Sequence, residues 1–181
     1  LAIAAGGNAM DNGVPLKTGF CVDQIEEQDG AFVLRSGADT VACRYAVNCA
    51  GQYADEIARI MGETDVDVVP KKGEYLLLDK QAGSLVSHTI FQVPTAAGKG
   101  VLVTPTVDGN LLIGPTSHAV SSKEDRDVTR EGIEEIRHKA EKSVSGLPLR
   151  QVIRSFAGLR ASVEGGDFVL RPGRRSPRFI H

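Results

Sequence analysis

Two apolar runs separated by a turn lie between Val101 and Thr116, with the sequence VLVTPTVDGNLLIGPT. Val, Leu, Ile and Thr suit the pleated surface of a sheet, and Asp108-Gly109 is typical of a type I′ turn, which needs positive φ at both central residues. The pattern predicts a hairpin. Because nearly every residue of both arms is apolar, we expect strands that are covered on both faces.

Three threonines interrupt this apolar pattern: Thr104, Thr106 and Thr116. Threonine is a common strand residue, so its presence needs no function. A hydroxyl group can also line a polar pocket. The sequence leaves both explanations open.

The first third of the chain consists of an Ala-rich start and short β-favouring runs. Residues 1–12 predict the end of a helix that stops at Asn12-Gly13. The β-favouring runs are Val14–Thr18, Phe20–Glu26, Gly30–Arg35 and Thr40–Cys49. They predict a first strand followed by a three-stranded meander, and a helix over residues 53–61 comes next.

The rest of the chain also predicts more strands than helices. The strand predictions are Val66–Pro70, Glu74–Asp79 after a Lys71-Lys72-Gly73 turn, Ser87–Val93, Gln151–Ser162 interrupted at Gly158, Phe168–Arg171, and a strand that begins at Phe179. Thr129 is a good N-cap for a helix that runs to about Val144. We therefore expect an α+β fold, in which helices cover one face of a mixed, largely antiparallel sheet.

Composition and charge are ordinary for a globular protein. Hydrophobic residues make up 41% of the 181 residues, charged residues make up 24%, and the formal net charge is −2. This balance gives no indication of a nucleic-acid partner. No apolar run reaches the roughly 18 residues of a membrane helix, and no signal peptide opens the chain, so we interpret the protein as cytoplasmic.

Metal and nucleotide motifs are not indicated. The three cysteines lack C-x-x-C spacing and the four histidines lack ligand spacing, so we predict neither a disulfide framework nor a metal site. Gly98-Lys99-Gly100 lacks the Ser or Thr and the following helix that a phosphate loop requires. The chain also lacks an initiator Met and ends in a strand-like sequence, which leads us to expect an internal fragment of a longer protein.

Two arginines lie in an apolar strand context, QVIRSFAGLRAS. Arg154 and Arg160 are six residues apart, so they point to the same side of a regular strand unless a bulge at Gly158 intervenes. A guanidinium in such a place needs an anion, either a substrate carboxylate or phosphate or an internal Asp or Glu. By contrast, we expect the later arginines, at positions 171, 174, 175 and 178, to form a solvated tail.

Several segments in order resemble the FAD-dependent oxidoreductases of the D-amino-acid oxidase type, and especially the glycerol-3-phosphate dehydrogenase branch. They are VNCAGQYADEIARIMG, PKKGEYLLLDK, IFQVPTAAGKGVLVTPTVDGNLLIGPT, and VIRSFAGLRAS followed by GDFVL. The resemblance covers about residues 13–170. It implies part of an FAD-binding domain over residues 1–64, a substrate-binding domain over 65–171, and the start of a C-terminal FAD segment over 172–181.

The same resemblance implies roles for individual residues. Ala50 and Gly51 match a flavin contact where small residues allow a close approach, and the backbone of Val22 lies in a strand that meets the adenine end. Arg160 matches the arginine that binds the anionic group of the substrate. Further substrate contacts are expected from Lys72, Arg154, Thr104 and Thr106. No general base can be identified from the sequence.

The resemblance implies oxidation of glycerol 3-phosphate, with hydride passing to FAD and electrons to a quinone or a similar acceptor. A quinone acceptor would place the intact enzyme at the inner face of the membrane. An oxidase of 2-hydroxy acids, such as 2-hydroxyglutarate, or of amino acids would use the same arginine on a carboxylate. A non-catalytic binding module is a third hypothesis. Since the chain lacks a G-x-G-x-x-G motif and the C-terminal flavin segment, we expect it to be colourless and inactive on its own.

Overall fold

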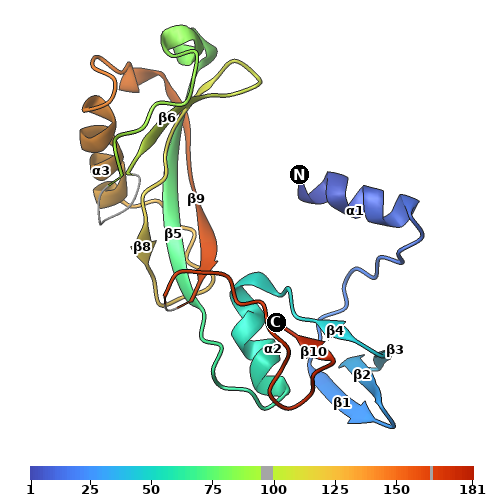
Figure 1. Cartoon of the computed structure of the whole chain (residues 1–181). Coiled ribbons are helices and arrows are strands. Elements are labelled where there is room, and N and C mark those ends of the chain that lie inside the picture. Colours follow the sequence, from blue (N-terminus) through green and yellow to red (C-terminus); the bar gives the residue numbers. More distant parts are fainter. Residues whose placement is uncertain (95–99, 164) are drawn as a thin grey trace. The chain divides into compact units, whose positions relative to one another are not determined.

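The computed structural model describes residues 1–94, 100–163 and 165–181, and Figure 1 shows their helices and strands. The chain folds into two units, and each has a hydrophobic core. Unit 1 contains Leu1–Cys49, Glu56–Asp65 and Val169–His181. Unit 2 contains Ala50–Asp55 and Val66–Phe168. Unit 1 is thus assembled from three separate segments of the sequence.

The sheet of unit 1 is an antiparallel meander, as predicted. It consists of β1 (Gln24–Gln28), β2 (Ala31–Ser36) and β3 (Asp39–Cys43) in the order β1-β2-β3. Asp29 and Gly30 join the first two strands with φ of 48° and 80°, the combination of a type I′ turn. The first strand predicted at Val14–Thr18 is wrong: these residues are exposed, and no neighbouring strand is available within the described residues to complete a ladder.

The core of unit 1 joins the meander to the strand and helix that follow it and to the C-terminal end of the chain. Phe32 of β2 packs edge to face against Phe179 at a centroid separation of 6.3 Å. Phe179 belongs to β10 (Phe179–Ile180), which pairs in parallel with β4 (Ala46–Val47), so the strand expected at the end of the sequence is confirmed. Helix α2 (Ala54–Ile60) adds Ile57 to this core.

The predicted helix at the start of the chain is also present. It is α1 (Ala2–Asp11), and Asn12 and Gly13, with φ of +83° at Gly13, end it as expected. None of its residues is buried. Helix α1 is therefore held by its own backbone hydrogen bonds and not by side-chain packing in a core.

The later arginines do not form a solvated tail, so that prediction is wrong. Glu63 is 3% exposed and accepts hydrogen bonds from His181 Nε2 at 3.0 Å, from the Arg175 backbone N–H at 3.3 Å and from Arg171 at 3.4 Å. Arg171 and Arg174 also pair with Asp65. The carboxylates that these arginines meet come from a distant part of the sequence, which explains why the run of basic residues gave no sign of them.

The Glu63 carboxyl group is stabilised in its charged form. Burial raises its pKa, but the combined hydrogen bonds from Arg175, His181 and Arg171 outweigh that effect and leave the pKa below its usual value. Glu63 therefore holds the C-terminal segment onto unit 1 as a carboxylate.

The sheet of unit 2 is organised around β5 (Val69–Leu78). β9 (Val152–Ser162) pairs with β5 along nearly its whole length. β7 (Leu111–Gly114) and β8 (His118–Ala119) pair with the two halves of its other edge, and β6 (Leu102–Pro105) pairs with β7. All these pairings are antiparallel. With the parallel β4–β10 pair of unit 1, they confirm the predicted mixed, largely antiparallel α+β fold.

β5 and β9 are continuous at two places where the sequence predicted an interruption. Lys71, Lys72 and Gly73 do not form a turn but lie within β5, and Gly158 does not interrupt β9. The charge on Lys72 is accommodated because Asp125 pairs with it, and Gly73 is required because a Cβ there would lie 2.9 Å from the Cβ of Pro115. The glycine therefore permits close packing rather than a turn.

Three further sequence expectations differ from the structure. The predicted strand Ser87–Val93 is reduced to one bridge between Ile90 and Val103, and the predicted strand Phe168–Arg171 is irregular. Gly98 and Lys99 of the predicted Gly98–Gly100 turn lie outside the described residues. Three short 3₁₀ helices complete the elements: η1 (Gly51–Tyr53), η2 (Lys80–Leu85) and η3 (Leu149–Gln151).

The hairpin predicted between Val101 and Thr116 is present as β6 and β7, but its turn is not type I′. Thr106 and Asn110 close a three-residue loop through the Thr106 N–H and the Asn110 carbonyl, and Gly109 has φ of +84°. Such a loop needs positive φ only at its last residue. The hairpin also has one buried face rather than two, because Val103, Leu111 and Ile113 are buried, whereas Leu102, Thr104 and Leu112 are half-buried.

Helix α3 (Arg130–Glu141) covers that buried face (Figure 1). It begins as predicted, with the Thr129 hydroxyl accepting the Gly132 N–H at 3.0 Å. Ile136 and Ala140 pack into a core with Leu76 and Leu78 of β5. None of the helices within residues 1–94, 100–163 and 165–181 has the length and apolar composition of a membrane span.

A buried carboxylate fixes the start of α3 to the sheet. Glu74 is 1% exposed, and it accepts hydrogen bonds from the hydroxyl of Thr129 at 2.9 Å and from Thr116 at 3.2 Å. The backbone N–H of Thr129 also donates a hydrogen bond to Glu74 Oε1 at 2.5 Å. Gly132 makes room for this carboxylate, since a Cβ at that position would lie 1.9 Å from Glu74 Oε2.

We predict that Gly132→Ala destabilises unit 2. In an open helix this change stabilises by about 1 kcal/mol, but here it forces Glu74 from its site, and such overpacking costs about 1–3 kcal/mol. Urea unfolding measures the difference. Gly6→Ala in α1 is the matched control, because no heavy atom lies within 4 Å of its Cβ position, and it should not lower stability. Equal effects of the two changes would contradict the role of Gly132.

We predict that unit 1 loses stability as the pH falls below 4.5, the ordinary pKa of a glutamate. Since the pKa of Glu63 is lower in the folded state, the unfolded state takes up a proton first, and the stabilisation is lost as the pH falls through the folded pKa. In urea unfolding at about pH 6 and about pH 3.5, Glu63→Gln should show a smaller pH dependence than the wild type. Asp11→Asn, on exposed α1, should keep the wild-type dependence.

Candidate functional site

The side of the unit 2 sheet opposite α3 carries the candidate site, and we name this side the open face. In β5 the residues alternate strictly: Lys72, Glu74, Leu76 and Leu78 are buried on the α3 side, whereas Lys71 and the other odd-numbered residues are half-buried or exposed. Directly opposed residues of antiparallel strands point to the same side. The register of β5 with β9 therefore identifies the residues of the open face.

Arg160 and Arg154 both lie on the open face, as their strand parity predicted. Arg160 is opposite Lys71, and Arg154 is opposite Leu77, with no register shift between these two pairs. The only irregularity lies between Leu77 and Leu78, so the bulge considered at Gly158 does not occur.

The two arginines nevertheless occupy different parts of the open face. Six residues of strand separate them by about 20 Å. Between them, Tyr75 and Phe156 stack with ring centroids 5.2 Å apart and an interplanar angle of 12°. Side chains that stand perpendicular to a sheet cannot bring both guanidinium groups to one small anion across this distance. The structure does not bring Arg154 and Arg160 together.

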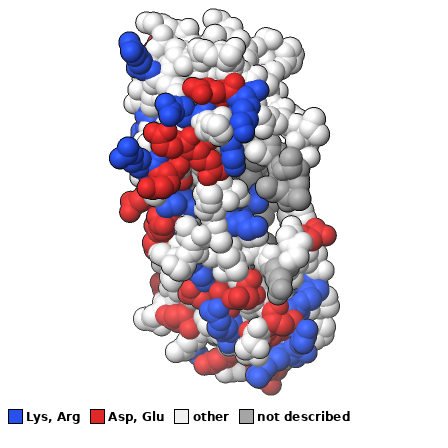
Figure 2. All heavy atoms as spheres, turned by 90° about the vertical axis from the view of Figure 1, so that its left-hand side faces the viewer, with Lys and Arg blue, Asp and Glu red and all other residues white. Residues whose placement is uncertain are grey.

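Lys71 is the residue that the structure does bring to Arg160. The Cβ atoms of directly opposed residues are about 5 Å apart, and two like charges at such positions repel each other. Within the described part of the chain, neither cation has a carboxylate within ion-pair distance, and the same holds for Arg154. On the α3 side, in contrast, Lys and Arg residues lie among Asp and Glu residues (Figure 2).

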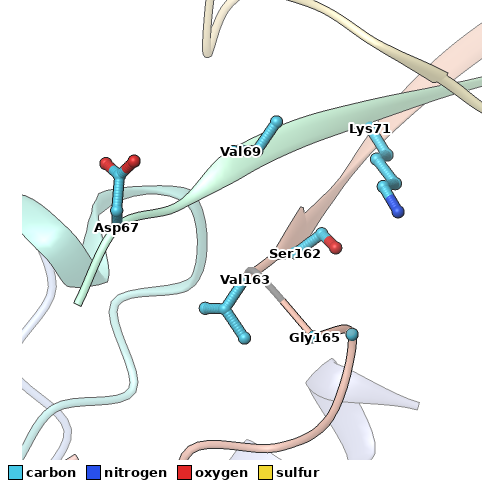
Figure 3. Close-up of a pocket in the computed structure, with 7 residues that line it drawn as sticks. Asp67, Val69, Lys71, Ser162, Val163 and Gly165 are labelled. Atoms are coloured by element: carbon cyan, nitrogen blue, oxygen red, sulfur yellow. The ribbon is translucent and has the colours of Figure 1, made fainter. Parts of the chain in front are cut away.

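Open space adjoins these two cations. No heavy atom lies within 4 Å of the position that a Cβ would take on Gly158, two residues before Arg160. On the other side, Lys71 and Ser162 line a hollow of about 570 Å³. Figure 3 shows Lys71 on β5 and Ser162 at the end of β9, beside the segment that carries Val163 and Gly165, with the Asp67 carboxylate pointing away from Lys71. A small ligand thus has room beside Lys71, in the hollow, and over Gly158, on the Arg160 strand.

Lys72, predicted from the sequence as a substrate contact, lies on the opposite face of β5 from Arg160. It is 6% exposed, and its ammonium group donates to both carboxylate oxygens of Asp125 at 2.9 Å. This hydrogen bond holds the pKa of Asp125 below its usual value. The structure does not bring Lys72 together with Arg160.

The two threonines predicted as substrate contacts have different environments. Thr104 is opposite Leu112 in the β6–β7 ladder, and Leu112 is opposite Leu77 of β5. Because Leu77 is in turn opposite Arg154, Thr104 lies on the open face, level with Arg154. The Thr106 hydroxyl instead accepts the Asn110 N–H at 3.0 Å and helps to close the hairpin loop. Of the two, only Thr104 lies on the open face.

A flavin contact of the expected kind requires open backbone at Ala50 and Gly51. Gly51 has φ of +59°, and no heavy atom lies within 4 Å of its Cβ position, so a dinucleotide can approach its backbone closely. Ala50 is exposed and precedes it, which also fits. Val22 is half-buried and precedes β1 in unit 1. No group of three or more His, Cys, Asp or Glu within the described residues is arranged to hold a metal ion.

Sequence reasoning missed Lys71. Lys71 and Lys72 are adjacent basic residues, and composition does not distinguish them. The register that places Lys71 opposite Arg160 depends on pairing between strands far apart in the sequence. The alternation of buried and half-buried residues along β5 distinguishes Lys71 from Lys72. Because the sequence predicted a turn at these residues, it predicted no alternation there.

Comparisons with known proteins agree on one family. The family model described as FAD dependent oxidoreductase matches residues 1–181. A glycerol 3-phosphate dehydrogenase of Caloramator mitchellensis is 43% identical over 179 residues, which are 99% of this chain and 37% of that protein. The mitochondrial L-2-hydroxyglutarate dehydrogenase of Mus musculus is 39% identical over 88 residues, which are 47% of this chain and 19% of that protein.

A solved structure extends this similarity to the fold. It is the dithionite-reduced L-alpha-glycerophosphate oxidase of Mycoplasma pneumoniae with FAD bound, with a TM-score of 0.82 and 28% identity. The match covers 95% of this chain and 46% of that chain. The chain therefore spans less than half of the length of each of these relatives.

We predict that Lys72→Met lowers the urea midpoint of unit 2 and leaves the KM for an anionic substrate unchanged. The change leaves Asp125 without its cation, but it acts on the face away from Arg160. Lys71→Met is the matched control, because Lys71 has no described ion pair and faces the like charge of Arg160, and it should not lower the urea midpoint. A raised KM in Lys72→Met with unchanged stability would contradict the structural role of Lys72.

Proposed function

Because the chain belongs to the FAD-dependent oxidoreductase family, we propose that the intact protein oxidises glycerol 3-phosphate and that unit 2 binds this substrate. The observation that carries the proposal is the Lys71–Arg160 pair, two cations that face each other on the open face with no described carboxylate partner. An anion of the substrate is the natural counter-charge for such a pair.

Arg160 has the central role in this proposal. Its planar guanidinium group offers parallel N–H donors that match two oxygens of a phosphate. Gly158 leaves space beside it for the rest of the substrate. Binding the phosphate at a fixed place orients the carbinol carbon, and such orientation is a large part of what a protein contributes to a flavin reaction. Thr104 is proposed as a contact for a hydroxyl group farther along the face.

The cofactor is proposed to meet the chain at Gly51 and Ala50, with Val22 near its adenine end. The open backbone at Gly51 fits such a contact. When bound, FAD supplies the acceptor for the hydride that leaves the carbon bearing the hydroxyl group. In this proposal residues 1–64 are part of the FAD-binding domain, residues 65–171 bind the substrate, and residues 172–181 begin a further FAD segment.

The electron acceptor is proposed to be a quinone or a similar compound. A cytoplasmic enzyme that reduces a quinone meets it at the inner face of the membrane, so we propose a peripheral association there for the intact protein.

The second candidate function is oxidation of a 2-hydroxy acid or an amino acid. Arg160 would bind a carboxylate in that case, with the same bidentate geometry. The similarity to the mouse relative supports it, although over a shorter part of the chain than the similarity to the dehydrogenase of Caloramator mitchellensis. Two cations at one site favour the phosphate. A non-catalytic binding module is the third candidate, and flavin-dependent turnover by the intact protein would exclude it.

We predict that Arg160→Ala lowers kcat/KM for glycerol 3-phosphate by about 100-fold or more in the flavin-loaded intact protein. The variant removes the two parallel hydrogen bonds of the guanidinium group to the phosphate, and a hydrogen bond to a charged group is worth about 1.5–3 kcal/mol. Steady-state kinetics with glycerol 3-phosphate, 2-hydroxyglutarate and amino acids as substrates measures the effect and selects between the candidates.

Arg150→Ala is the control, because Arg150 is an exposed arginine of unit 2 that lies in η3, ten residues before Arg160. It should keep the wild-type kcat/KM. Arg160→Lys should recover part of the activity, since it restores the charge without the fork. An unchanged KM in Arg160→Ala would overturn the assignment of the anion site.

A further inference from the structure

We propose that Lys71 determines the substrate specificity of this site, because its second positive charge selects a dianionic phosphate over a singly charged carboxylate. The proposal rests on the function proposed above and names the residue that separates its first candidate from its second.

The register of the sheet gives Lys71 this position. Lys71 and Arg160 are directly opposed in the β5–β9 ladder, whereas Arg154 is six residues away along β9, beyond the Tyr75–Phe156 stack. A group of phosphate size beside Arg160 is therefore within reach of Lys71 and out of reach of Arg154.

The charge balance of the pair gives Lys71 its selectivity. Two like charges opposite each other weaken a sheet, and no described carboxylate relieves them. A phosphate monoester carries nearly two negative charges at neutral pH and offers three acceptor oxygens, so it neutralises both cations. A single carboxylate neutralises one of them and leaves the other unpaired.

The described residues around Lys71 include no ion-pair partner for its charge. The neighbouring Lys72 shows what such a role requires, because it is buried and hydrogen-bonded to Asp125. Lys71 is half-buried, lines the hollow together with Ser162, and has no ion pair among the described residues. Its ammonium group is available to a ligand.

The test uses Lys71→Gln in the flavin-loaded intact protein, at constant pH and ionic strength. Sulfate and acetate serve as competitive inhibitors, because they carry two and one negative charges. We expect the KM for glycerol 3-phosphate and the inhibition constant of sulfate to rise about 10-fold to 100-fold, in keeping with the loss of a hydrogen bond to a charged group. The inhibition constant of acetate should change by less than about threefold, as for a weak exposed charge contact.

Two further variants complete the test. Lys71→Arg should restore sulfate binding, because it restores the positive charge. If Lys71 had only a structural role, its charge would not affect sulfate binding. Lys80→Gln, the change of another exposed lysine of unit 2, should have no effect on either inhibitor.

The outcomes separate the two proposals. The role of Lys71 is overturned if Lys71→Gln weakens the binding of sulfate and acetate equally, or weakens the binding of neither. If Arg160→Ala still abolishes tight substrate binding in that case, the proposed function stands. If Arg160→Ala is also without effect, the proposed function is overturned as well.

Discussion

The antiparallel pairing of β5 with β9 decides which side chains share the open face. Lys71 meets Arg160, Tyr75 meets Phe156 and Leu77 meets Arg154 in one uninterrupted register. A slip by one residue would exchange the two faces of a strand, so the site exists only in this register. Two glycines lie opposite each other in this register: Gly73 packs under Pro115, where a Cβ would clash, and Gly158 leaves open space on the strand of Arg160.

The other face of β5 explains why these cations remain available. Its charged residues are satisfied within the protein: Lys72 by Asp125, and Glu74 by Thr116 and Thr129. A buried charge is tolerated only with such partners, and here the partners also fix the start of α3. One strand thus uses Lys72 and Glu74 for packing on one side and carries Lys71, which has no ion pair among the described residues, on the other. Its strict alternation turns two adjacent lysines into residues with different roles.

Local sequence patterns predicted the elements that depend on neighbouring residues. The meander of unit 1, the hairpin and the Thr129 cap of α3 were all confirmed because turn residues and caps act within a few positions. Predictions that needed distant partners were wrong: β5 was divided at Lys71–Gly73, and the later arginines were taken for a solvated tail although Glu63 and Asp65 pair with them. For the site, the parity of Arg154 and Arg160 was predictable. Their separation by an aromatic stack and the role of Lys71 depend on sheet register, which no local pattern specifies.

The strength of the cation pair depends on how far water is kept from it. Two unit charges about 4 Å apart interact by about 1 kcal/mol in water but by about 4 kcal/mol at the effective dielectric constant near a protein surface. Arg160 is exposed on β9, so repulsion from Lys71 costs the sheet little, and attraction to an anion is equally weak. Both effects grow when the open face is covered. A phosphate that arrives with its own negative charge turns the growing repulsion into attraction, so covering the site strengthens binding of the dianion more than that of a carboxylate. The specificity proposed for Lys71 therefore increases with the extent to which water is excluded from the site.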